Sequence, residues 1–168
     1  MPTPQDHGFW SDAHQPARGA VGAAADSTVL RYLRGGFREA TAVLSQSLGP
    51  SHCRLGCHGG RAHLALGSAT LCSADGAHVW PEGLAHYYAA HGTPCPPALE
   101  QLARAAAASS GGSGGGWRLY DECERRAVPM PRAMREHLAA TTLLLTDAEY
   151  VGMARESLTT TTYARGRS

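Results

Sequence analysis

The sequence contains no lysine, and all 15 of its basic residues are arginine. This bias, together with frequent alanine, glycine and proline, indicates a GC-rich genome, such as that of a green alga, and says little about function. The formal net charge is +1, so the chain as a whole is not attracted to nucleic acid or to a membrane. Residues 27–65 nevertheless hold five arginines against one glutamate, an excess that suits either an acidic partner or a solvated surface.

Aromatic residues make up only 7% of the chain, which predicts a modest hydrophobic core. No apolar run approaches the roughly 20 residues of a transmembrane helix. The polar, proline-broken start also lacks the apolar region of a signal peptide. Five cysteines is an odd number for a disulfide framework. We therefore expect a reducing, cytoplasmic location, with thiols that are free or bound to metal.

Composition divides the chain into four segments. Residues 1–27 lack hydrophobic periodicity and are expected to form a flexible leader. Residues 28–108 are expected to fold as a small α+β, zinc-finger-like domain of short antiparallel strands and helices. The run SSGGSGGG at 109–116 is typical of a flexible linker. Residues 117–168 are then predicted to form a helical arm with a loose tail.

Helices are indicated at several places in the central domain. Apolar residues at helical spacing predict a helix over 37–48, and TVLRYL at 28–33 suits either a strand or a helical turn. Pro81 is a favourable first residue for a helix that ends at Gly92. A further helix is predicted over 97–108.

Short strand-like segments lie between these helices and are separated by turn residues. The dipeptide Asp75-Gly76 predicts a tight turn between two antiparallel strands. Trp80, Leu84 and Tyr87 are predicted to be buried around the site described next. The three strand-like segments are HLAL at 63–66, ATLCS at 69–73 and AHVW at 77–80.

Two pairs of metal-ligating residues flank these segments. CRLGC places Cys53 and Cys57 on a turn that its glycine allows, and WPEGLAHYYAAH places His86 and His91 on a helix. The pattern is C-x3-C…H-x4-H, with 28 residues between the pairs. Structural zinc sites take four Cys and His ligands in tetrahedral geometry, commonly from a turn and a helix. The sequence thus predicts a structural zinc ion held by these four residues.

The spacing of the two histidines sets a condition on the helix. Residues five apart lie about 140° apart around a regular helix axis. The last turn must therefore unwind or widen for His86 and His91 to reach one ion, and Gly92 makes such a distortion easier. His58 is an alternative to Cys57 as the second ligand.

The same residues also fit a domain that binds no metal. Cys57 and Cys72 would then be small buried hydrophobes, His86 a hydrogen-bonded core residue and His91 an exposed one. A catalytic metal would need an open coordination position and a nearby acid or base, for which Glu82 is the local candidate.

The same motifs carry a family resemblance. YLRGGFRE, CRLGC, a DG turn and WPEGLAHY followed by His91 resemble a family of small uncharacterised proteins from bacteria and eukaryotes. The resemblance covers about residues 30–97 and implies that the Cys pair and the two histidines form a zinc-finger-type site. The family pattern has two residues between its cysteines, whereas this chain has three. Cys57 and His58 therefore both remain candidates for the second ligand. The family brings no activity with it.

Enzyme chemistry has weak support in the sequence. Pairs such as Cys95 with His91, or Cys123 with His137, resemble a thiol nucleophile and its base, but nine histidines and five cysteines produce such pairs by chance. The glycine run at 109–116 lacks the Lys-Ser pair of a phosphate-binding loop. No catalytic residue and no small-molecule substrate are expected.

The sequence therefore predicts a non-enzymatic protein-interaction module stapled by zinc. Phe9 and Trp10 in the leader are candidate anchors for a partner or for the domain itself. Such a chain suits a structural subunit or adaptor in a larger assembly, for example a cytoskeletal, axonemal or ribonucleoprotein complex. The alternative is a nucleic-acid-binding zinc finger, although WPEGLAHYYAAH lacks the Arg, Asn or Gln residues of a base-reading helix.

Overall fold

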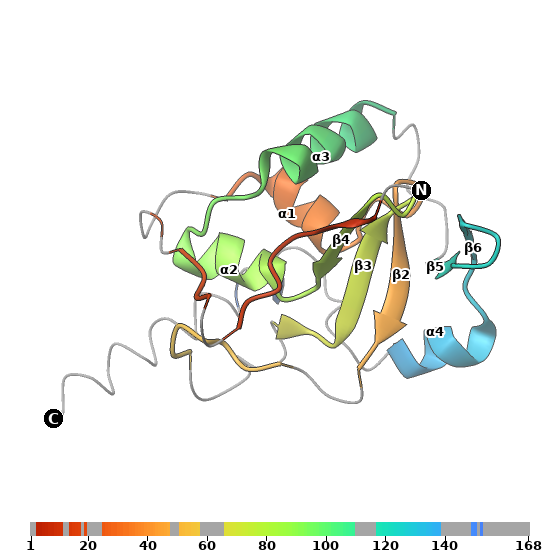
Figure 1. The fold of residues 1–168 in the computed structure, drawn as a ribbon. Coiled ribbons are helices and arrows are strands. Elements are labelled where there is room, and N and C mark those ends of the chain that lie inside the picture. The colour runs from red at the N-terminus through yellow and green to blue at the C-terminus, as the bar shows by residue number, and fades with distance from the viewer. Residues whose placement is uncertain are drawn as a thin grey trace, which may run out of the picture.

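The computed structural model describes residues 3–11, 14–17, 19, 25–47, 51–57, 66–109, 117–138, 149–150 and 152. They form a six-stranded mixed sheet in the order β1-β4-β3-β2-β5-β6, with α1, α2 and α3 on one side of it (Figure 1). This arrangement confirms the predicted α+β class. His58, the segment 110–116 and nearly all of 139–168 lie outside the described residues, and with them the second-ligand alternative, the linker and the tail.

The centre of the sheet consists of β2 (Thr41–Gln46), β3 (Ala69–Ser73) and β4 (His78–Pro81), paired antiparallel. Side chains alternate between the two faces of these strands, and partners in register share a face. The face that meets the helices carries Val43, Leu71 and Trp80, and the opposite face carries Ala42, Cys72 and Val79.

The helix expected over 37–48 is wrong, because Thr41–Gln46 forms β2. This strand pairs with β3 on one side and with β5 on the other, and its first half, residues 41–43, is buried on both faces. A strand buried on both faces has no alternation of apolar and polar residues, so its short apolar run also fits helical spacing. Pairing with β3 and β5 therefore makes this segment a strand and not a helix.

Three helices cover the inner face of the sheet. α1 (Ser27–Leu33) resolves the strand-or-helix ambiguity at 28–33, and the Asp26 carboxylate caps it by accepting the N–H groups of Thr28 and Val29. α2 (Leu84–His91) begins later than predicted because Pro81 ends β4. The helix predicted over 97–108 is confirmed as α3 (Pro97–Ser109).

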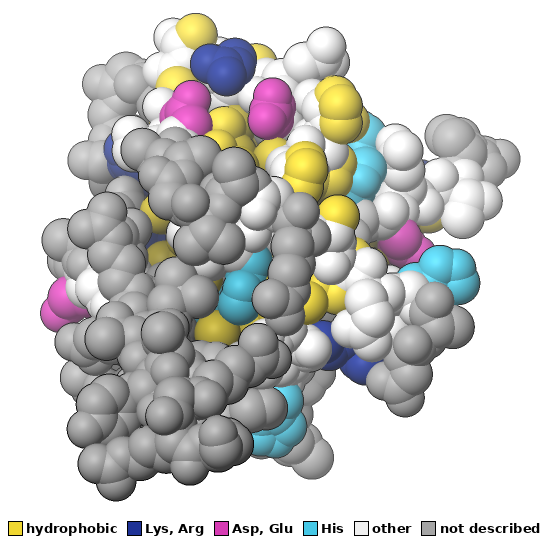
Figure 2. All heavy atoms as spheres, turned by 90° about the vertical axis from the view of Figure 1, so that its left-hand side faces the viewer, with side chains coloured by type: hydrophobic (Ala, Val, Ile, Leu, Met, Phe, Trp, Pro, Cys, Tyr) yellow, Lys and Arg dark blue, Asp and Glu magenta, His cyan; other side chains and the backbone are white. Residues whose placement is uncertain are grey.

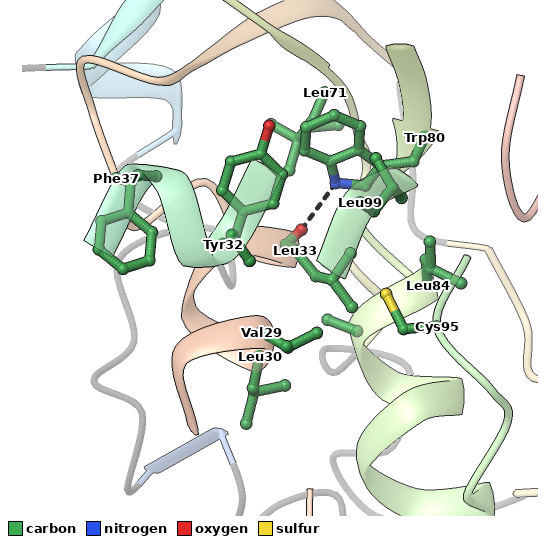
Figure 3. Packing of buried hydrophobic residues seen from close by; sticks show 14 of the residues in the cluster. Val29, Leu30, Tyr32, Leu33, Phe37, Leu71, Trp80, Leu84, Cys95 and Leu99 are labelled. Atoms are coloured by element: carbon green, nitrogen blue, oxygen red, sulfur yellow. Dashed lines mark hydrogen bonds between the residues drawn. The ribbon is translucent and has the colours of Figure 1, made fainter. Parts of the chain in front are cut away.

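The main core lies between these helices and the sheet (Figure 3). The Trp80 ring stacks on Tyr32 with centroids 5.3 Å apart. Its indole Nε1 donates a hydrogen bond to the carbonyl of Leu33 at 2.9 Å. Trp80 and Leu84 are 0% and 1% exposed, which confirms their predicted burial, but they lie in this main core and not in the cluster that holds Cys53 and Cys57.

The turn between β3 and β4 also follows the prediction. Gly76 donates its N–H to Ser73 O at 2.8 Å and has a φ of +70°. A side chain there would be strained by this backbone conformation, and its Cβ would meet the Tyr120 ring at 2.3 Å. The Asp75-Gly76 dipeptide therefore forms the expected tight turn.

Segments on both sides of the predicted central domain join the sheet, which the sequence did not indicate. β1 (Gln5–Asp6), from the expected leader, pairs in parallel with β4. β5 (Arg118–Asp121) and β6 (Arg126–Pro129), from the expected helical arm, form a hairpin that joins β2, and α4 (Arg132–Leu138) follows. The arm is thus not wholly helical. The hairpin turn depends on Asp121, whose carboxylate accepts two backbone N–H groups.

Candidate metal centre

The loop of residues 51–57 carries the two cysteines of the candidate site. Arg54 and Leu55 form a turn, and Gly56 closes it by donating its N–H to Cys53 O at 3.3 Å. Gly56 has a φ of +87°, a conformation that L side chains rarely adopt. This turn reverses the chain between Cys53 and Cys57, so that both thiols face the same imidazole.

α2 carries the two histidines, and its last turn is wider than a regular one. Tyr87 O accepts the N–H of Gly92, five residues on, and that of Thr93, six residues on, at 3.1 Å. Gly92 has a φ of +62°, as is common where a helix ends. The rings of His86 and His91 lie with centroids 5.1 Å apart. The last turn of α2 is thus widened, as the five-residue spacing of His86 and His91 requires if both are to reach one ion.

The structure brings together all four residues that the sequence predicted. Cys53, Cys57, His86 and His91 each offer one ligand atom, and these atoms all lie within 4.8 Å of one another. His91 Nε2 is 3.2 Å from Cys53 Sγ and 3.3 Å from Cys57 Sγ. The four side chains are 4%, 7%, 0% and 7% exposed in the order of the sequence.

The chemistry of the cluster suits a metal ion better than an apolar contact. Both ring nitrogens of His86 are buried without a hydrogen-bond partner. A buried polar atom left unpaired costs about 1–3 kcal/mol, and bonding to a metal removes that cost for one nitrogen. The side-chain hydrogen bond from Cys57 lowers the pKa of the Cys53 thiol far below its usual range, with burial opposing and His86 and His91 adding to the effect. The thiolate, which is the metal-binding form, is thereby favoured.

A small cluster of side chains surrounds the four residues and is separate from the main core. Tyr87 and Leu66 are buried in it, and Trp10 packs edge-on against the Tyr87 ring with centroids 4.4 Å apart. Tyr87 Oη accepts the backbone N–H of Arg54 at 2.9 Å, which ties the cysteine loop to α2. Sequence reasoning placed Tyr87 in the core but missed this contact, since it joins residues far apart in the chain.

Glu82 does not belong to the cluster. It is 1% exposed, and its Oε2 accepts the N–H groups of Ser68 and Ala69 at 3.1 and 3.3 Å. A Cβ on Gly67 would lie 1.9 Å from that oxygen, so only glycine fits beside it. Glu82 therefore fixes the entry to β3.

The remaining thiols are not near the cluster. Cys72 lies on the opposite face of the sheet and Cys95 lies in the main core, and burial raises the pKa of each to about 12. Both behave as small hydrophobes at neutral pH. Cys123 is exposed in the hairpin turn.

Together the fold and the site define an α+β domain in which a buried Cys2His2 cluster joins a loop to a helix. None of the helices among the described residues is long and apolar enough to cross a membrane. Compared with known protein families, with curated proteins and with solved structures, the chain matches none.

Proposed function

We propose that this chain is a non-enzymatic protein-interaction module whose cysteine loop and α2 are joined by one structural zinc ion. The observation that carries this proposal is that Cys53, Cys57, His86 and His91 converge and are all buried. Structural zinc sites use all four tetrahedral positions for protein ligands, whereas catalytic sites keep one open for water or substrate. A cluster with four protein donors belongs to the first kind.

Zinc is the metal that best fits these donors. Two thiolates and two imidazoles in a tetrahedron are typical of zinc. Zinc bond lengths place neighbouring ligand atoms about 3.3–3.8 Å apart. The distances from His91 Nε2 to the sulfurs, 3.2 and 3.3 Å, are close to that range. The ion would act in place of a hydrophobic core, because few apolar side chains pack around the loop.

An interaction role is supported by two features: the reactive side chains outside the cluster are engaged or buried, and an aromatic side chain beside it is exposed. Glu82 is committed to backbone N–H groups, and Cys72 and Cys95 are buried away from the cluster. Phe9, in contrast, is 50% exposed beside it. A module of this kind serves as a structural subunit or adaptor in a larger assembly, such as a cytoskeletal, axonemal or ribonucleoprotein complex.

Direct nucleic-acid binding is the alternative, and the surface gives it less support. Figure 2 shows the face on the left-hand side of Figure 1, where the basic and acidic side chains of the described residues are interspersed. Most of α2 is buried, which leaves little of it to enter a groove. Arg31 and Arg38, from the arginine-rich segment, stack on the Phe37 and Trp117 rings.

The test is metal content and folding of the full chain, measured by elemental analysis and circular dichroism. We expect about one zinc per wild-type chain, with loss of both zinc and fold in His86→Ala. His52→Ala, an exposed histidine beside the loop, is the control and should keep both. A stable wild-type chain without zinc would overturn the metal assignment.

The interaction role needs a separate measurement. The native chain, extracted from its source, should elute in a complex well above the mass of a single chain. Elution as a monomer, with zinc bound, would contradict the subunit role while leaving the metal site intact. Loss of the complex on nuclease treatment would favour the ribonucleoprotein setting.

A further inference from the structure

A cleft of about 470 Å³ opens beside the candidate metal centre. One wall is the N-terminal segment Gly8–Trp10, and another is the cysteine loop, including Cys53 itself. Pro81, Gly83 and Tyr87 complete the lining. Its volume falls in the range of about 300–1,000 Å³ that is usual for ligand pockets.

The N-terminal wall presents an exposed aromatic ring. Among the described residues, Phe9 is the large hydrophobic side chain that stands exposed, at 50%. Its neighbour Trp10 is held edge-on against Tyr87. Exposed aromatic residues at the edge of a concave site are the usual anchors of protein–protein contacts. The cleft is therefore suited to an apolar side chain of a partner.

Among the described residues that line the cleft, the one with a fixed charge is Arg54. None of the described residues that line it is Asp or Glu, whereas His52 and Arg54 are both exposed on the cysteine loop. Arginine binds carboxylates by paired hydrogen bonds. A ligand that complements this lining has an acidic group next to its apolar group.

Both walls are held by backbone hydrogen bonds before any ligand arrives. Gln5 N–H donates to Ala77 O at 2.9 Å and His7 N–H donates to Val79 O at 2.8 Å, which fixes the N-terminal segment along β4. On the other side, the Arg54 N–H is fixed to Tyr87 Oη. A cleft formed in advance loses little entropy when it binds a ligand.

We propose that this cleft binds a short peptide segment of a partner protein in which an aromatic or large aliphatic side chain stands next to Asp or Glu. The proposal rests on the function proposed above and names the chemistry of the partner. A single strand of nucleic acid suits the cleft less well, because stacking of successive bases needs several exposed rings. Tyr87 is only 4% exposed, and the Trp10 ring already packs against it.

The test uses the full zinc-loaded chain as bait for a phage-displayed library of random octapeptides. We expect enrichment of peptides that pair Phe, Trp, Tyr or Leu with a neighbouring Asp or Glu. A synthetic copy of an enriched peptide should lose about tenfold in affinity for Phe9→Ala and for Arg54→Glu. Arg135→Glu, which changes an exposed arginine of α4, is the matched control and should bind as the wild type does.

Zinc content is measured on the same samples, so that a failure of this proposal is distinct from a failure of the proposed function. Zinc-loaded, folded protein that enriches no peptide, or enriches basic peptides, overturns the cleft assignment alone. Equal binding by the wild type and both cleft variants overturns it as well. A ten-nucleotide oligo(dT) that binds more tightly than the enriched peptide, and is weakened by Arg54→Glu, would assign the cleft to nucleic acid instead.

Discussion

Trp80 closes the end of α1: its indole Nε1 donates to the carbonyl of Leu33, the last residue of that helix, at 2.9 Å (Figure 3). Both residues are 0% exposed. The last carbonyls of a helix have no partner within it, so this bond satisfies a group that would otherwise be buried and unpaired. A side chain of β4 thereby fixes where α1 lies on the sheet.

Replacement of Trp80 by Phe should therefore destabilise the fold strongly. The change removes the donor and part of the ring, leaving a buried carbonyl unpaired and a cavity, and we expect a loss of about 2–4 kcal/mol in the free energy of unfolding. Urea titration followed by circular dichroism measures it.

Trp117→Phe is the matched control for that variant. Trp117 is also buried, at 7% exposure, but its Nε1 has no hydrogen-bond partner. The same loss of ring volume should then cost less than in Trp80→Phe, about 1–2 kcal/mol, because no hydrogen bond is broken and a phenyl ring can still stack on Arg38. A loss in Trp80→Phe no larger than that in Trp117→Phe would contradict the prediction.

Local signals in the sequence were sufficient for some elements and not for others. α3 has a proline at its start and apolar residues at helical spacing, and the β3–β4 turn has Asp75 and Gly76, so both could be predicted. β2 could not, because its burial on both faces depends on strands and helices far away in the chain. β1 has only two residues and exists through its pairing with β4, which no periodicity reveals.

More of the candidate metal centre than of the surrounding fold could be predicted from the sequence. Its ligands come as two local pairs, and each pair is visible as a short motif. The supporting contacts could not be predicted. The Tyr87 bond to Arg54 N–H and the packing of Trp10 on Tyr87 link segments that meet only in the folded chain.

The attachment of β1 should weaken in acid. His7 is 8% exposed and its Nε2 lies 3.0 Å from His78 Nδ1, so protonation of His7 places a charge in a largely buried site beside a second imidazole. Burial lowers the pKa of His7 below its ordinary value of 6.5, His78 adds to the effect, and Asp6 opposes it. His7 therefore binds a proton more readily when β1 is detached from β4 than when it is attached. By linkage, the attachment weakens as the pH falls below 6.5. The hydrogen bond from the Ser73 hydroxyl lowers the pKa of Asp75, with burial opposing and nearby His78 adding a smaller effect.

Amide hydrogen exchange at His7 reports this detachment, since its N–H is bonded to Val79 O. Protection, corrected for intrinsic exchange, should fall between about pH 7 and pH 5.5 in the wild type. In His7→Gln it should change little over the same range. His14→Gln, an exposed histidine, serves as control. Protection that is independent of pH in the wild type would contradict the prediction.

Variants of Cys57 and of its neighbour His58 can decide which of the two is the second metal ligand of the loop. Cys57 Sγ lies 3.3 Å from His91 Nε2, so Cys57→Ser should abolish stoichiometric zinc and, with it, most of the folding stability. His58→Ala should keep one zinc per chain, as should Cys72→Ser, whose thiol lies on the other face of the sheet. Elemental analysis after dialysis measures all three. Zinc lost in His58→Ala and kept in Cys57→Ser would assign the ligand to His58.

Tyr87 and Tyr88 allow the support of the metal centre to be separated from general stability. Tyr87 Oη accepts the N–H of Arg54 in the cysteine loop at 2.9 Å, and Tyr88 Oη accepts that of Asp26 at the start of α1 at 3.0 Å. Loss of a contact that orients metal ligands typically lowers metal affinity by about 10–100-fold, so Tyr87→Phe should weaken zinc binding by at least about tenfold. Tyr88→Phe should lower stability by about 1 kcal/mol and leave zinc affinity unchanged. Competition with a chromogenic chelator measures the affinities. Equal zinc affinity in the two variants would mean that the loop holds its geometry without Tyr87.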